Sequence, residues 1–379
     1  MTESDSIVSE LMSLRMCRKH SVNTHTKDNF IMFQTLESFD TELSADSVEW
    51  CPSENFQDIF VCGTYQLTSN DSEGFPTLNK VKRVGRIYLF QVDDKKLRLL
   101  QQLDVPAVLD MKWCHIKIYG KILLGVCNSE GYLQIYELIK DELEFASEIA
   151  VNDASEKPLA LSLDWSTGRR LETTEDIKIV VSDSQGSVSL FNIAGSVKNI
   201  ERISRLHGHD FEAWIAAFDY WNTNVLYTGG DDCKFLRFDT RINSPTHTNR
   251  LHNAGVTSLH SNWKKEYSLV SGSYDETLRT WDTRHFRRPL EELNLNGGIW
   301  RLKWDPYEAR YLLAACMYNG FFIVDSQIPN IVAEYKEHKS IAYGCDWSFG
   351  KEQRENSLVA TCSFYDHLLK LSSVQMKEL

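Results

Sequence analysis

Residues 251–284 show the most regular alternation of apolar and polar positions in the chain. Three apolar runs of strand length, at 256–259, 268–270 and 277–281, are rich in β-branched residues. Polar breaks that contain Lys, Gly, Ser and Asp separate the runs. The pattern predicts a meander of short antiparallel strands.

The same stretch resembles one blade of a WD-repeat protein. It runs from His252 to Trp281 and Asp282, which is the frame of that repeat, and it carries the Ser-Gly-Ser-x-Asp turn at the same place. The resemblance implies that the turn residue Asp275 bonds His252 and the strand residue Ser271. We therefore expect these polar residues to stabilise the blade rather than to perform chemistry.

A single blade cannot bury both of its faces, so a repeat fold needs further copies about 40–45 residues apart. Such copies are present, and in five of the seven the first run ends in Trp, with Phe218 and His260 in the other two. The seven copies span residues 48–92, 108–138, 161–193, 207–241, 251–284, 299–325 and 341–372. The five tryptophans are Trp50, Trp113, Trp165, Trp304 and Trp347. The sequence thus predicts an all-β fold, a seven-bladed WD-repeat β-propeller.

An additional strand is expected ahead of the first copy, at residues 30–39. In WD-repeat proteins such a strand forms the outer edge of the last blade. We predict the same closure here, because it removes exposed sheet edges. The predicted domains are a flexible segment at 1–28 and one propeller at 29–379. The early apolar positions are too few for a signal peptide, and no stretch is long and apolar enough to span a membrane.

Composition excludes several classes of protein. The net charge of −12, with only short basic clusters, argues against nucleic-acid binding, which depends on neutralising phosphates. The 9 cysteines form no C-x-x-C pair, so we expect reduced, buried thiols, no metal site and a cytoplasmic protein. Phosphate-binding glycine patterns and the G-x-S-x-G and H-E-x-x-H motifs are absent, so no cofactor is expected. We expect the protein to be a monomer.

Aromatic residues are expected to meet at one end of the propeller. Alignment of the copies on the residue that ends the first run places Trp214, Trp300 and Tyr343 at one equivalent position, near the mouth of the central channel. The other copies have Asp46, Leu109, Leu161 and Val256 at this position. Three aromatic side chains therefore converge there in the predicted fold.

The turns between the second and third runs are expected to open at the same end. In the last three copies they carry Tyr274, Tyr318 and Tyr365. Polar neighbours that the repeat does not require are Glu212, Asp231, Glu276 and His367. Two interpretations follow. In the first, the aromatic residues fill the channel or contact a protein partner. In the second, they form a cage for a cationic ligand together with the acids.

Six segments resemble those of the diphthine methylesterase family, the WD-repeat proteins of the diphthamide pathway. They are HDFEAWIAAFDYW (209–221), GGDD (229–232), GSYDE (272–276), GGIWRLKWDP (297–306), LLAACMYNGF (312–321) and YGCDWS (343–348). The likeness is dense over 205–348 and thin before residue 200. It implies a carboxylic-ester hydrolase that removes the methyl ester from methylated diphthine on a modified histidine of elongation factor 2, which leaves diphthine for later amidation. Elongation factor 2 is then the protein partner.

The implied substrate carries a trimethylammonium group beside the ester, which suits an aromatic and acidic mouth. Gly298 is a candidate donor to the oxyanion that forms during hydrolysis. The expected substrate-binding residues are Trp214, Asp231, Tyr274, Gly298, Trp300, Tyr318, Tyr343 and Tyr365.

Ester hydrolysis also needs a general base. The candidates are Glu212, Glu276, His367 and His209, of which His209 also occupies a scaffold position of the repeat. Cys316 and Ser273 fit a buried thiol and a turn hydroxyl better than a nucleophile, so activated water is favoured. The resemblance supplies no nucleophile.

Two other functions remain open on the sequence alone. A non-catalytic scaffold that binds elongation factor 2 or trafficking proteins would use the same end as a docking surface, without clustered titratable groups. A reader of a small ligand or of methyl-lysine would need the aromatic cage, but no base or oxyanion donor.

Overall fold

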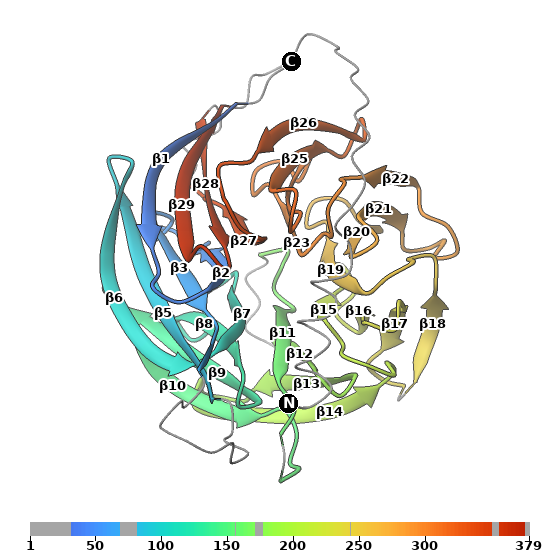
Figure 1. Cartoon of the computed structure of the whole chain (residues 1–379). Coiled ribbons are helices and arrows are strands. Elements are labelled where there is room, and N and C mark those ends of the chain that lie inside the picture. The colour runs from blue at the N-terminus through green and yellow to red at the C-terminus, as the bar shows by residue number, and fades with distance from the viewer. Residues whose placement is uncertain are drawn as a thin grey trace, which may run out of the picture. The chain divides into compact units, whose positions relative to one another are not determined.

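A computed structural model describes residues 32–68, 82–155, 157–170, 177–242, 244–350 and 356–375. Residues 31–379 form one compact unit, in which seven antiparallel sheets surround a central axis (Figure 1). This arrangement confirms the predicted seven-bladed β-propeller. The prediction of a flexible segment at 1–28 lies outside the described residues.

Each blade contains four main strands, which follow one another in chain order from the axis outward except in the last blade. Blade 1 contains β2 (Ala45–Trp50), β3 (Ile59–Thr64), β5 (Lys82–Asp93) and β6 (Lys96–Pro106), with the short β4 (Gln66–Thr68) on β5. Blade 2 contains β7 (Val108–Trp113), β8 (Ile122–Asn128), β9 (Tyr132–Ile139) and β10 (Glu142–Ala150), and blade 3 contains β11 (Ala160–Trp165), β12 (Lys178–Asp183), β13 (Ser187–Ile193) and β14 (Ile200–His207).

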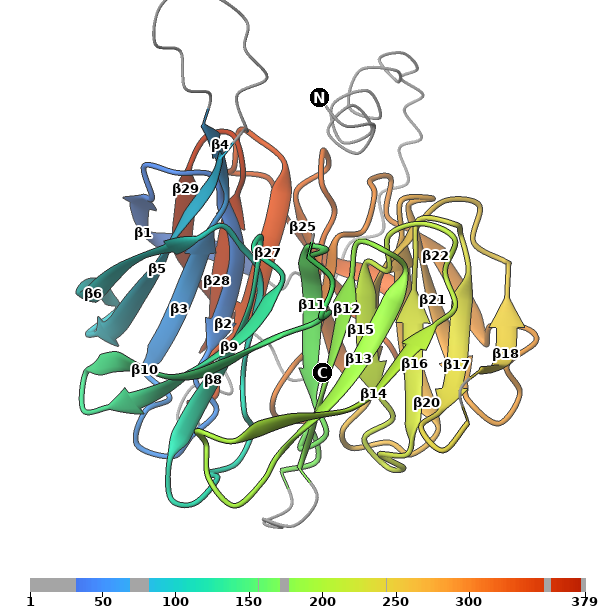
Figure 2. The ribbon, with the colours of Figure 1, turned by 90° about the horizontal axis from the view of Figure 1, so that it is seen from below.

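The remaining blades repeat this order. Blade 4 contains β15 (Ile215–Phe218), β16 (Val225–Gly229), β17 (Phe235–Asp239) and β18 (Pro245–Asn249), and blade 5 contains β19 (Val256–Ser261), β20 (Ser268–Ser273), β21 (Thr277–Asp282) and β22 (Glu291–Asn294). Blade 6 contains β23 (Arg301–Trp304), β24 (Tyr311–Ala315), β25 (Phe321–Asp325) and β26 (Asn330–Tyr335), and blade 7 contains β27 (Ala342–Trp347), β28 (Asn356–Ser363), β29 (Leu368–Gln375) and β1. Because the order repeats, the inner strands all begin at one end of the axis and end at the other (Figure 2).

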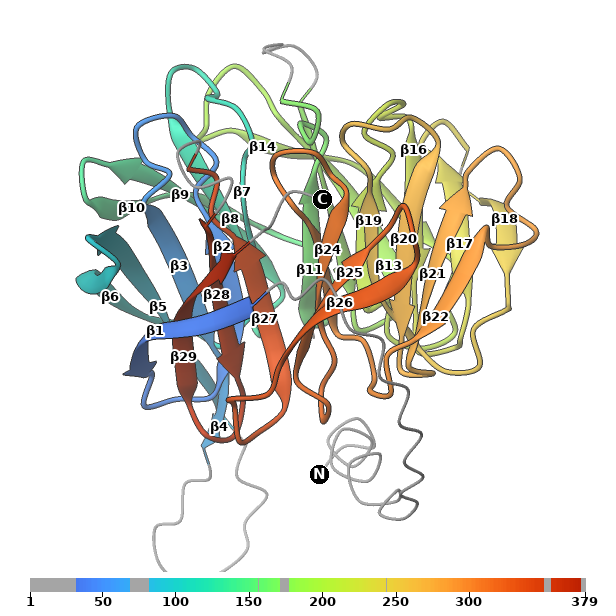
Figure 3. The same cartoon turned by 90° about the horizontal axis from the view of Figure 1, so that it is seen from above.

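The first described strand closes the ring. β1 (Met32–Asp40) pairs antiparallel with β29, from Met32 opposite Gln375 to Asp40 opposite Leu368. Figure 3 shows the two strands, blue and red, side by side. The predicted closure by a strand that precedes the first repeat is confirmed. Hydrogen bonds between β1 and β29 therefore close the ring.

The tryptophans that end the inner strands link neighbouring blades. Four of them donate the indole N–H to a backbone carbonyl at the end of the preceding blade's inner strand. The bonds are Trp113 to Glu49 (3.0 Å), Trp165 to Lys112 (2.9 Å), Trp304 to His260 (3.3 Å) and Trp347 to Lys303 (3.1 Å). The repeated Trp is thus a structural link between blades.

We expect Trp165→Phe to lower the free energy of unfolding by about 1–2 kcal/mol more than Trp50→Phe does. Both substitutions remove the same atoms from a fully buried ring, but the Trp50 indole N–H has no partner among the described residues. The difference therefore measures the bond to Lys112. Phe218 takes the equivalent place in blade 4, so Phe fits sterically. Urea unfolding of the two variants provides the measurement, and equal losses would mean that the bond contributes nothing.

Blade 5 corrects the predicted alignment by one residue. Ser261 pairs with Leu269 at the place where Trp304 pairs with Leu312 in blade 6. The residue equivalent to the terminal Trp is therefore Ser261, and not His260 as predicted. The prediction failed because this blade has no aromatic residue there to guide the alignment. With this correction, the blade 5 residue at the mouth of the channel is Thr257 and not Val256.

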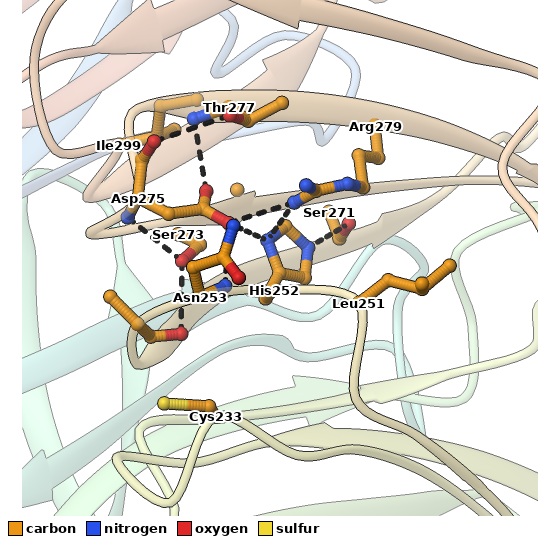
Figure 4. A network of polar contacts seen from close by, with 12 residues as sticks. Cys233, Leu251, His252, Asn253, Ser271, Ser273, Asp275, Thr277, Arg279 and Ile299 are labelled. Carbon is orange, nitrogen blue, oxygen red and sulfur yellow. Dashed lines mark hydrogen bonds and ion pairs between the residues drawn. The ribbon is translucent and has the colours of Figure 1, made fainter.

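The polar scaffold predicted for blade 5 is present (Figure 4). His252 Nδ1 lies 3.0 Å from Asp275 Oδ2, and its Nε2 lies 2.8 Å from Ser271 Oγ. The indole N–H of Trp281 donates to the same Ser271 oxygen at 2.8 Å. Both imidazole nitrogens are therefore occupied, and His252 is structural, as the repeat implied.

Candidate functional site

Four aromatic side chains meet at the end of the axis where the inner strands begin. We name Trp214, Tyr274, Trp300 and Tyr343 the aromatic cluster. The ring centroids are 5.8 Å apart for Trp214 and Trp300, 6.1 Å for Tyr274 and Trp300, and 4.8 Å for Trp300 and Tyr343. Such distances are typical of direct ring contact. The rings therefore pack against one another, and blades 4 to 7 each contribute one.

The cluster is only partly covered. Trp214, Tyr274 and Trp300 are half-buried, whereas Tyr343 is 7% exposed. Phe364, which the sequence reasoning missed, continues the ring contacts from Tyr343, at 5.0 Å between centroids. The cluster thus forms a closed aromatic platform rather than an open cage, with three rings that reach solvent.

Acidic groups lie along the blade 4 side of the platform. Asp231 Oδ1 accepts a hydrogen bond from the Trp214 indole N–H at 3.0 Å. The Asp231 backbone N–H donates to the carbonyl of Glu212 at 2.9 Å. Gly255 permits this approach, since a Cβ there would lie 2.8 Å from Asp231 Oδ1 and 3.1 Å from Tyr274 Cδ2. Predicted acids and predicted rings therefore share one site.

The acids also change the ionisation of their neighbours. Burial raises the pKa of Glu212, a backbone N–H lowers it, and the nearby charge of Asp231 raises it again. Burial raises the pKa of Tyr274 as well, and Asp231 and Glu212 add to that increase. Tyr274 therefore keeps its hydroxyl proton at neutral pH. Glu212 is a carboxylate with a higher proton affinity than an ordinary glutamate, which suits a general base.

A backbone donor lies on the other side of Tyr274. A Cβ on Gly298 would lie 3.1 Å from Met317 Sδ and 3.3 Å from Tyr274 Cδ1, so the glycine borders the platform. Within the described residues its N–H has no hydrogen-bond partner. An unpaired N–H beside the platform can donate to a developing oxyanion.

Two predicted tyrosines form the rim of this end. Tyr318 and Tyr365 are 68% and 56% exposed. The Tyr365 ring contacts Phe364, at 5.1 Å between centroids, and so joins the platform indirectly. These exposed rings lie where a macromolecular substrate would first make contact.

Two candidate bases lie outside the platform. Glu276 is exposed and His367 is half-buried, and both have positive φ, at 67° and 52°. The His367 carbonyl accepts from the Thr41 N–H at 2.8 Å, which ties this turn to the closing strand. No hydrogen bond or ring contact joins either side chain to the aromatic cluster in the part of the chain described.

The candidate His209 belongs to the scaffold of blade 4. It is 1% exposed, its Nδ1 lies 2.8 Å from Asp232 Oδ1, and its Nε2 lies 2.7 Å from Thr228 Oγ1. This arrangement matches that of His252 in blade 5. Neither nitrogen is left to accept a proton from water.

Asp46 is a buried acid that the sequence reasoning did not select. It is the blade 1 counterpart of Trp214, Trp300 and Tyr343, and it is only 6% exposed. Its pKa is raised to about 8, because burial and the charge of Asp110 raise it more than the charge of Arg301 lowers it. Its Oδ2 has no hydrogen-bond partner among the described residues. The alignment did place Asp46 at the mouth, but its lack of a partner becomes visible only in three dimensions.

Two further predictions concern the cysteines and membrane-spanning segments. Seven of the eight described cysteines are buried and all eight are free. Four of them, Cys62, Cys127, Cys345 and Cys362, lie in strands. No helix in the described part of the chain is long and apolar enough to cross a membrane.

Comparisons with known proteins agree with this architecture. The family model described as WD domain, G-beta repeat matches residues 243–282. A mouse protein named diphthine methyltransferase is 41% identical over 335 residues, which cover 83% of this chain and 70% of the relative. The human protein of that name is 39% identical, with 83% and 74% covered. A Dictyostelium discoideum homolog is 34% identical, with 87% and 96% covered.

One solved structure illustrates the fold alone. A chain from the crystal structure of a mitotic checkpoint complex superposes with a TM-score of 0.67, over 96% of this chain and 99% of that one, at 16% identity.

Proposed function

The chain belongs to the diphthine methyltransferase family, whose name indicates a role in diphthamide biosynthesis, and we propose that it is the hydrolase that removes the methyl ester from methylated diphthine on elongation factor 2. The product acid is then available for amidation. We place this reaction in the cytoplasm, where elongation factor 2 acts.

The aromatic platform beside Asp231 and Glu212 carries the proposal. The substrate presents a trimethylammonium group, and each contact of such a group with an aromatic face contributes about 0.5–2 kcal/mol. Trp214, Tyr274 and Trp300 offer three partly exposed rings to it. The neighbouring carboxylates add attraction for the same positive charge. The ester, which lies beside the ammonium group, is then held near Glu212 and Gly298.

The proposed reaction needs only groups at this site. Glu212 accepts a proton from a water molecule, whose oxygen attacks the ester carbonyl carbon. The carbonyl π electrons move to oxygen, and the Gly298 N–H donates to that oxyanion. When the tetrahedral intermediate collapses, the methoxide leaves and takes the proton from Glu212. The products are a carboxylate, a proton and methanol.

The proposal is tested with the purified protein and elongation factor 2 that carries methylated diphthine. We expect the modified peptide to lose the mass equivalent of one methylene group while methanol appears in solution. Binding without mass loss would favour the scaffold function. Gain of a methyl group from an added methyl donor, with no methanol, would mean that the protein transfers methyl groups instead.

We expect Trp300→Leu to raise KM about 2–30-fold with little change in kcat, since one aromatic contact with the cation is lost. Tyr267→Leu is the matched control. The Tyr267 ring is exposed and lies beside the charge of Arg284. Tyr267 precedes β20, whereas Tyr274 of the platform follows β20, so Tyr267 lies at the opposite end of the blade. Added tetramethylammonium should inhibit the wild type and inhibit Trp300→Leu less strongly. An unchanged KM in Trp300→Leu would mean that the platform does not bind the substrate.

A further inference from the structure

A cavity opens at the opposite end of the axis, where the inner strands end. All seven blades contribute to its wall, and its volume is about 60 Å³. That is room for about four water molecules. None of the four residues of the aromatic cluster lines it. The cavity is therefore a second concave site on the same axis, and the proposed ester hydrolysis does not use it.

Arg170 is the unusual charge in this cavity. Its guanidinium carbon lies 4.6 Å from the ring centroid of Phe349 and 5.1 Å from that of Trp263. Among the described residues it has no ion pair and no hydrogen-bonded side-chain partner, and its Nε is buried. Its backbone lies in the left-handed region, at a φ of 56°, which is a strained conformation often found at functional sites. Two aromatic rings thus hold a cation with which no carboxylate of the described residues forms an ion pair.

The two carboxylates of the cavity have another partner. Lys303 forms an ion pair with Glu49, and its Nζ lies 3.9 Å from Asp346 Oδ1. Asp346 Oδ2 also accepts the Trp50 backbone N–H at 2.8 Å. Both acids therefore have partners other than Arg170. Burial lowers the pKa of Arg170 and the nearby charge of Asp346 raises it, but among the described residues no carboxylate forms an ion pair with the guanidinium.

Neighbouring histidines respond to the same positive field. Burial and, to a smaller extent, the charges of Arg170, Lys303 and Lys112 together lower the pKa of His115 to about 3. Burial also lowers the pKa of His260 well below its usual range, and Lys303 and Lys112 contribute. Both imidazoles therefore stay neutral at physiological pH. A neutral imidazole adds no positive charge but can still donate one hydrogen bond.

We propose that this cavity binds a small oxyanion, a carboxylate or a phosphate, whose charge pairs with Arg170. A charge that is largely removed from water and lacks a partner is unfavourable, and an anion beside it removes much of that cost. A guanidinium matches the paired oxygens of either group and donates two parallel hydrogen bonds. The small volume admits the oxyanion itself, either free or at the tip of a longer molecule that enters from solvent.

Equilibrium binding of inorganic phosphate and of acetate tests the proposal without any elongation factor. Calorimetry and thermal melting are run at constant ionic strength, with chloride as the balancing ion. We expect saturable binding of at least one of the two anions to the wild type, with a matching rise in Tm. The tighter of the two identifies the oxyanion class that the cavity prefers.

Two variants locate the binding. Arg170→Gln should weaken it at least about tenfold, which is the loss expected for one charge-assisted contact. Arg169→Gln is the matched control, because Arg169 stacks on Trp221 at 3.7 Å but does not line the cavity, and it should keep the wild-type affinity within about twofold. The Tm of each variant without anion shows whether it is folded. Absence of saturable binding to the wild type, or equal affinity in a folded Arg170→Gln protein, would overturn the proposal.

Discussion

Glu212→Gln is expected to lower kcat on methylated diphthine about 10²–10⁴-fold, with little change in KM. A general base contributes a rate factor of that size, and the amide cannot accept the proton from water. The substitution keeps the shape of the side chain, so the platform that binds the ammonium group is left intact. Single-turnover release of methanol measures the effect directly.

The pH dependence provides a second readout of the same group. Because the pKa of Glu212 is raised in the folded protein, wild-type kcat/KM should fall as the pH drops through that raised pKa. Glu212→Gln should lose this acidic limb. A raised pKa contributes stability at low pH and loses it as the pH rises, so the uncharged Gln is not expected to destabilise the fold at neutral pH.

Glu334→Gln is the control for this variant, since Glu334 is exposed on β26 at the outer edge of blade 6. It should keep wild-type kinetics. Full turnover in Glu212→Gln, together with loss of turnover in Glu276→Gln or His367→Asn, would mean that the general base is Glu276 or His367 and not Glu212.

The fold could be predicted because its signal is repeated seven times. The Trp that ends most inner strands binds the preceding blade, so the same packing requirement recurs in the sequence at a constant spacing. Blade 5 shows the limit of this reasoning. Without an aromatic residue at Ser261, one of two adjacent positions had to be chosen, and only the strand pairing distinguishes them.

The aromatic part of the site could be predicted for the same reason. Equivalent positions in a repeat become neighbours around an axis, so Trp214, Trp300 and Tyr343 meet even though they are far apart in the chain. The closed packing of their rings, however, depends on side-chain directions that an alignment does not contain.

Charges were harder to place than rings. A backbone hydrogen bond between the segment before β15 and the segment after β16 joins Glu212 and Asp231, whereas Glu276 lies in an exposed turn. Asp46 and Arg170 depend on neighbours from several blades. A missing partner is a property of the folded protein, and no local sequence pattern reports it.

A ring of mostly polar residues lies in the interior of the propeller and affects its stability. Each blade contributes the residue that comes one position before the end of its inner strand, and most of these residues can carry charge. The ring consists of Glu49, Lys112, Asp164, Ala217, His260, Lys303 and Asp346. Lys303 from blade 6 pairs with Glu49 from blade 1 across blade 7, and it lies beside Asp346. Its single positive charge therefore stabilises two acids from two other blades.

Lys303→Met is expected to lower the free energy of unfolding by about 3–5 kcal/mol, because it leaves two buried carboxylates without their cation. The Met side chain keeps most of the volume of the lysine stem, so lost packing contributes little. Urea unfolding at neutral pH provides the measurement. Adding Glu49→Gln to Lys303→Met should recover a large part of the loss, since one of the two uncompensated charges is then removed.

The loss should also depend on pH. Burial raises the pKa of Glu49 and of Asp346 above their usual values, and Lys303 opposes both shifts. Removing Lys303 raises them further, so the carboxylates protonate more readily in the folded variant than in the unfolded chain. Protonation removes the uncompensated charge, and the destabilisation should therefore shrink as the pH falls from 8 to about 5. A loss that is constant over this range would assign the effect to packing and not to charge.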